Sequence, residues 1–167
     1  MAKTDFDAVA YVKNMLEKNR LFVENEFSFT TAPSIGDMAD MVYESREAAN
    51  HFVLIDTSTS NTALQANGGF YERKQYTCFM LMRFEPGNEQ ERIEKLGICR
   101  ELKRQVLSRM IADSNRYEEE ELLFFDTQNV LSQELQNFML NGLTGLWIIF
   151  QLDQPADLRL DSNEWLD

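Results

Sequence analysis

The chain has 167 residues, of which 44% are hydrophobic and 26% charged, a composition that fits one globular domain and argues against global disorder. A formal net charge of −12 repels phosphates, so neither direct nucleic-acid binding nor attachment to an anionic membrane is expected. Cys78 and Cys99 are too few for a disulfide framework, and neither a signal-peptide-like start nor a membrane span is expected, which favours a cytoplasmic protein.

The first third of the chain predicts two helices around a short strand. Apolar residues at helical spacing predict a helix over 5–18, and alternating aromatic residues predict a strand at 27–29. Ser34 and Asp37 have the spacing of a capping box, which predicts the start of a second helix over 35–49.

The middle of the chain predicts two strands separated by a loop. The apolar run at 52–55 is typical of a buried strand. Polar residues then dominate 57–70, and the Asn-Gly-Gly sequence near its end predicts a long loop. Apolar residues on both faces of 71–84 predict a long central strand.

The clearest helix is predicted over 89–114, where an apolar stripe recurs at helical spacing. Arg100, Lys103, Arg104 and Arg109 form the best basic cluster of the sequence and fall on this helix. Acidic residues surround them, so we interpret the cluster as a solvated face or a salt-bridged interface rather than a nucleic-acid site.

After this helix, a short apolar strand is predicted at 122–125, followed by a strand pair at 138–140 and 143–152. Asn141 and Gly142 between them are a strong hairpin-turn signal, although a turn at 144–145 is an alternative.

The element order predicts the α+β class. We expect one domain over 1–167, with a mainly antiparallel (mixed) sheet, helices packed on one face, and an acidic C-terminal tail over 153–167.

No pattern typical of a catalytic or cofactor site is found in the sequence. It has no nucleophile elbow, Walker A sequence or dinucleotide-binding glycine pattern. The only histidine, His51, is expected in a loop at the start of a strand, and Cys78 lies among apolar residues that do not activate a thiol. We therefore expect no enzyme, no catalytic residues and no cofactor. An enzyme with an unrecognised carboxylate site is an alternative, because Asp and Glu are numerous.

One short motif predicts a possible metal site. Asp56, Ser58 and Ser60 follow an apolar strand as D-x-S-x-S, which resembles the metal-ion-dependent adhesion site of von Willebrand A-type domains. Their oxygen ligands would suit Mg²⁺, so a metal-dependent binding module is a second hypothesis. The opposing interpretation is a Ser/Thr-rich loop whose hydroxyls satisfy the turn backbone.

The overall order of elements resembles the small α+β neck and tail-end proteins of tailed bacteriophages, of the tail-terminator or tail-completion type. The shared features are an N-terminal helix, the strand 71–84, the helix 89–114 and the late glycine-containing strand pair around 141–150. The resemblance implies a phage or prophage structural protein without cofactors, which forms rings through homo-oligomeric protein–protein contacts and is found in the cytoplasm or in an assembled virion.

Three aromatic residues are candidates for those contacts. Phe70 and Tyr71 adjoin the predicted loop 57–70, and Trp165 lies near the C-terminus. Aromatic side chains are common interface anchors, and a long polar loop can become ordered against a partner. The alternative for each is packing within its own chain.

Overall fold

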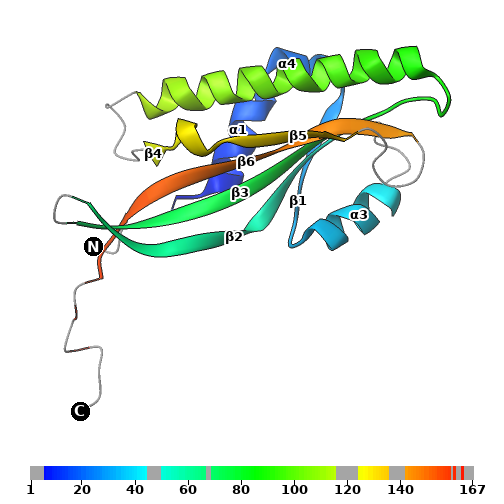
Figure 1. Ribbon diagram of the computed structural model, residues 1–167. Helices are drawn as coiled ribbons and strands as arrows, with labels where there is room; N and C mark the ends of the chain where they lie inside the picture. The colour runs from blue at the N-terminus through cyan, green and yellow to red at the C-terminus, as the bar shows by residue number, and fades with distance from the viewer. Residues whose placement is uncertain are drawn as a thin grey trace.

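The computed structural model of the protein describes residues 6–44, 50–66, 69–115, 124–135, 142–158, 160 and 163. In chain order, its elements are α1 (Ala8–Glu17), α2 (Arg20–Glu24), β1 (Phe27–Ala32), α3 (Ile35–Glu44), β2 (Asn50–Ala66), β3 (Gly69–Arg83), α4 (Glu89–Ser114), β4 (Phe124–Phe125), the 3-10 turn η1 (Thr127–Asn129), β5 (Leu131–Leu135) and β6 (Leu143–Ala156). Helices pack against a six-stranded sheet (Figure 1), which confirms the α+β class.

The sheet is mainly antiparallel, with β3 in its interior. The strand order is β1-β2-β3-β6, and both β4 and β5 pair with the far side of β6. Only β1 and β2 run parallel to each other among the described strands. β3 pairs with β6 from Phe70, opposite Ala156, to Arg83, opposite Leu143. The long central strand expected from two apolar faces is therefore confirmed.

The prediction of a loop over 57–70 is wrong. β2 continues to Ala66 and β3 begins at Gly69, and the two strands pair along the segment from Thr59, opposite Gln75. Register shifts after Ile55 and after Asn61 break the simple period of two by which a strand is recognised in a sequence. The tail likewise begins later than the predicted residue 153, because β6 extends to Ala156.

Helices cover both faces of the sheet, whereas the sequence predicted cover on one. α1, α2 and α4 pack on the face that carries Cys78, Met80 and Met82 of β3. α3 packs on the opposite face, in a cluster that includes Phe79 and Leu81. A strand that is apolar on both faces requires cover on both, and α3 provides the second layer (Figure 1).

Helix α4 has the bounds predicted from the sequence and lies along the sheet (Figure 1). Its start is capped by Asn88, whose side-chain oxygen accepts a hydrogen bond from the Glu91 backbone N–H at 3.1 Å. The buried residues repeat every three or four positions, which is the spacing of one helical face. They are Leu96, Cys99, Leu102, Val106 and Met110.

Three short elements were not predicted, namely α2, η1 and β5. The sequence predicted a hairpin between 138–140 and the strand that is now β6. Residues 136–141 lie outside the described part of the chain, and within that part β6 pairs with β5. α3 begins at Ile35 as predicted and is described to Glu44; the remaining residues of the predicted helix, 45–49, lie outside the described part of the chain. Within the described residues, no helix combines the length and the apolar character needed to cross a membrane.

Candidate interaction surface

The sheet continues past its apolar core into a three-stranded extension that we call the arm. The arm consists of residues 59–66 of β2, 69–75 of β3 and 153–156 of β6; β3 pairs with β6 in continuous register, and with β2 across the register shift after Asn61. None of its side chains that the structure describes is buried, whereas Cys78 to Met82 in the other half of β3 all are. In Figure 1 the paired ends of β2 and β3 reach past the end of α4.

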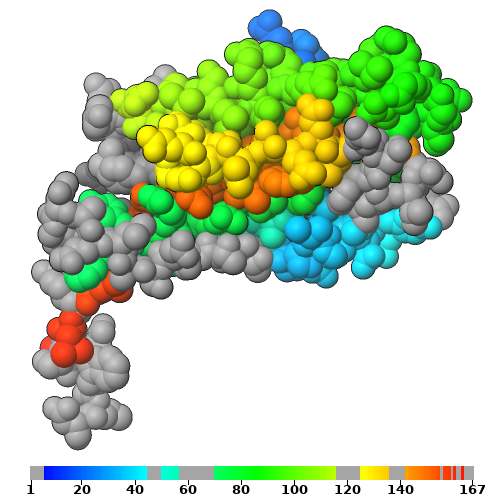
Figure 2. All heavy atoms as spheres, in the orientation of Figure 1, coloured from blue at the N-terminus to red at the C-terminus, as the bar shows by residue number. Residues whose placement is uncertain are grey.

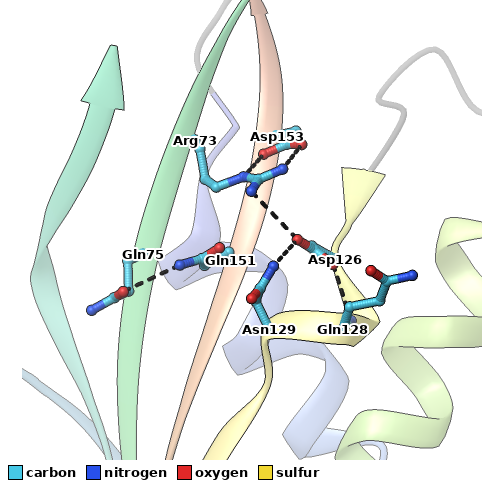
Figure 3. Close-up of polar contacts among 7 residues, drawn as sticks. All are labelled: Arg73, Gln75, Asp126, Gln128, Asn129, Gln151 and Asp153. Carbon is cyan, nitrogen blue, oxygen red and sulfur yellow. Dashed lines mark hydrogen bonds and ion pairs between the residues drawn. The ribbon is translucent and has the colours of Figure 1, made fainter. Parts of the chain in front are cut away.

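Cross-strand polar pairs occupy the base of the arm, where burial is lacking (Figure 3). Arg73 and Asp153 lie directly opposite each other, and the guanidinium donates two hydrogen bonds to the carboxylate, at 2.6 and 2.7 Å. Gln75 and Gln151 are the next same-face pair, with an amide hydrogen bond of 3.3 Å. Opposed pairs of this kind each stabilise a sheet by roughly 0.2–1 kcal/mol.

Asp126 connects this ladder to the edge of the sheet. Its carboxylate lies 3.6 Å from the Arg73 guanidinium and caps η1 by accepting a hydrogen bond from the Gln128 backbone N–H at 3.0 Å. The Asn129 side chain donates a further hydrogen bond to it (Figure 3). These contacts lower the pKa of Asp126, and the hydrogen bond from Asn129 makes the largest contribution to that shift. The hydrogen bonds to Asp153 raise the pKa of Arg73.

This cluster is suited to holding strands together rather than to proton transfer. A carboxylate whose pKa is lowered stays ionised near neutral pH, and a guanidinium does not release its proton. The described residues contain no group of three or more His, Cys, Asp or Glu side chains placed to hold a metal ion.

The prediction that the D-x-S-x-S motif lies in a loop is also wrong. Asp56, Ser58 and Ser60 all lie within β2, around the register shift between Ile55 and Thr59. The Asp56 side chain is exposed. The motif therefore occupies the middle of a strand that pairs antiparallel with β3, not a loop beyond the end of a strand.

His51 lies within β2 rather than in a loop, and it is only 2% exposed. Its Nδ1 is 3.4 Å from the Ser28 hydroxyl, which donates a hydrogen bond to the Asn50 carbonyl at 3.2 Å. Ser28 and His51 are register partners on neighbouring strands, which accounts for their proximity. A histidine buried to this degree offers no access to a substrate.

The basic cluster of α4 is salt-bridged and hydrogen-bonded within the chain. Arg104 pairs with Glu101 at 2.6 Å and Arg109 pairs with Asp113 at 2.8 Å, both within the helix. Arg100 pairs with Glu134 at 2.7 Å, and Lys103 contacts the Ser132 hydroxyl at 3.3 Å, so these two fasten α4 to β5. The cluster is thus used internally, as one of its two sequence interpretations anticipated.

Two of the three aromatic candidates lie on the arm. Phe70 is 36% exposed and begins the pairing of β3 with β6, and the neighbouring Tyr71 is half-buried. Trp165 lies outside the described residues. Sequence reasoning missed Leu158 and Leu160, which are 48% and 78% exposed after the end of β6. The signal was their spacing of two, which is that of one face of a strand.

The surface that these observations define therefore consists of the arm and the segment that follows it. Neither a family model nor a curated protein matches the chain.

Proposed function

We propose that this chain is a non-enzymatic assembly protein that works by binding further copies of itself, as a neck or tail component of a tailed phage or prophage. The observation that carries the proposal is the arm. A three-stranded extension reaches past the helical cover and carries no described buried side chain. An extension of this kind gains little stability within its own chain and offers backbone and side chains to a partner.

Two further observations support self-association. Exposed apolar residues follow the arm at Leu158 and Leu160, where a partner would bury them. Three of the four residues of the strongest basic cluster are paired with carboxylates within the chain, which leaves the acidic surface poorly suited to nucleic acid. The phage assignment itself rests on the resemblance in element order described above.

The test is the mass of the full chain in solution, measured by light scattering over a concentration series with and without Mg²⁺. A discrete multimer that persists without the metal is expected, and electron microscopy should show it as a ring. A monomer at every concentration would overturn self-assembly. A multimer that forms only with Mg²⁺ would favour the metal-dependent module at Asp56 instead.

A further inference from the structure

The two edges of the sheet differ in how well they are protected against pairing with another strand. On one side, β4 and β5 are separated by η1, so neither presents a long flat edge. Arg100 of α4 donates two hydrogen bonds to Glu134 of β5, at 2.7 and 2.9 Å, which places paired charges along this edge. Short strands, interruptions and charges are the usual protection of a sheet edge.

The β1 edge lacks the charges and the interruption. Its six residues, Phe27–Ala32, include no charged residue and no proline, and they run without a register shift against β2. Within the described part of the chain, β1 pairs with β2 alone. Its four middle residues are half-buried rather than covered. No strand of the described part of the chain therefore occupies its outer side.

Exposed apolar residues precede and follow β1 in the sequence. Val23, in the helix before β1, is 58% exposed, and Ile35, at the start of the helix after β1, is 54% exposed. An uncharged strand bordered by apolar residues is suited to bind a segment that brings its own apolar side chains.

The chain carries a segment of that kind after β6. Leu158 and Leu160 are two residues apart, so in an extended conformation they lie on one face, with Arg159 and Asp161 on the other. This alternation is typical of a half-buried strand. Yet the two leucines are 48% and 78% exposed. The coloured part of the chain after β6 lies away from the helices (Figures 1 and 2).

We propose that residues 157–161 of one copy add as a strand to the β1 edge of a second copy. This inference rests on the proposed function, self-association, and names the contact that produces it. The leucines would pack against the apolar side of the edge, and the charged residues of the tail would stay in water. In a chain of net charge −12, an uncharged edge is where an acidic tail meets the least repulsion.

The alternative is pairing of β1 with β1 of a second copy. That pairing buries less apolar surface, because it leaves Leu158 and Leu160 exposed. Pairing of the tail with β1 uses two different surfaces, so each copy acts as donor to one neighbour and acceptor from another. Such a head-to-tail contact closes into a ring or continues as a filament. It therefore accounts for a multimer larger than a dimer.

The first test compares two double variants of the full chain by light scattering. L158S/L160S removes the apolar face of the tail, and we expect at least a tenfold rise in the concentration at which the multimer forms. R159S/D161S, a matched control in the same segment, should associate within about threefold of the wild type. If L158S/L160S associates as the wild type does, the tail contact is overturned while the proposed self-association stands. A wild type that stays monomeric overturns both.

The second test identifies the acceptor by disulfide trapping between T31C, which lies on the same face of β1 as Phe27 and Phe29, and either L158C or L160C. The native thiols of Cys78 and Cys99 are buried, and burial raises the pKa of each, so they remain inert. Mixing T31C with a tail variant under mild oxidation should give a covalent dimer on a non-reducing gel, and each variant alone should not. A T31C homodimer would point to β1–β1 pairing, and the absence of every cross-link would exclude β1 as the acceptor; either result overturns the proposal.

Discussion

The two ends of β3 are held in place by different chemistry. At the core end, Cys78 to Met82 are all buried, between α4 on one face and α3 on the other. At the arm end, none of Phe70 to Gln75 is buried, and Arg73 and Gln75 make polar pairs with β6 instead. Burial of a large apolar side chain stabilises a fold by about 1.5–3 kcal/mol, against roughly 0.2–1 kcal/mol for a cross-strand pair. The core end therefore contributes most of the stability, and the sequence of the arm can change with little loss of stability.

The largest expected effect comes from Gly145, at the core end of β6. A Cβ there would lie 1.9 Å from the Met80 carbonyl oxygen, a backbone atom that cannot turn aside. We expect Gly145→Ala to cost more than about 4 kcal/mol or to prevent folding, measured by urea unfolding. Gly97→Ala is the matched control, because nothing lies within 4 Å of its added Cβ on helix α4. It should stabilise the protein by about 0.5–1 kcal/mol, and a G145A protein of wild-type stability would refute the close approach.

The comparison within β3 can be tested directly with one large-to-small substitution at each end. Met80 is fully buried, so Met80→Ala should cost about 2–5 kcal/mol. Phe70 is partly exposed on the arm, so Phe70→Ala should cost less than about 1 kcal/mol. Both are measured by chemical denaturation of the same chain at one protein concentration. Equal losses would contradict the division of the strand into a core and an arm.

The polar ladder predicts a modest, pH-dependent effect. Asp126→Asn removes the carboxylate that accepts the Asn129 hydrogen bond and pairs with Arg73, which should cost about 1 kcal/mol at pH 7. The folded protein lowers the pKa of Asp126 below its ordinary value of 3.8, so this stabilisation is present above that value and is lost as the pH falls through the lower, folded pKa. The free energies of unfolding of the wild type and D126N should thus converge as the pH falls below 3.8. A constant difference in free energy would mean that Asp126 acts through packing.

The smallest effect is expected at Glu26, between α2 and β1. Its φ of 53° is left-handed, a conformation that glycine adopts at no steric cost. Glu26→Gly should leave stability unchanged or raise it by less than about 1 kcal/mol, as measured by thermal unfolding. A clear loss would show that the Glu26 side chain makes a stabilising contact that outweighs the relief of the backbone.

Elements with a strong apolar period could be predicted from the sequence, and elements without one could not. α4 and the core of β3 carry such periods, and their bounds were predicted within two residues. The arm half of β2 has a polar composition and register shifts after Ile55 and Asn61, so it resembled a loop. The placement of α3 on the second face depended on the tertiary arrangement, since its own amphipathic pattern does not say which face it covers.

The candidate surface was predicted in part. Phe70 and Tyr71 were chosen beside a supposed loop, and both lie on the arm. The Arg73–Asp153 pair joins residues 80 positions apart, so only the strand register brings it together. For the charges of α4 the sequence left two interpretations open, a solvated face and a salt-bridged interface. The pairs Arg104–Glu101 and Arg109–Asp113 agree with the second, because acidic residues at helical spacing are visible in the sequence.

The position of β6 has a consequence for the order of folding. β6 follows every other described element in the chain, yet it lies between β3 and the β4–β5 edge. On a ribosome, helix α4 would emerge before the strand that completes its side of the core, including Leu146, Ile148 and Phe150. Folding therefore has to wait for nearly the whole described chain, and pairings of such long range are formed slowly. A chain that stopped before residue 143 would expose one side of β3 to aggregation.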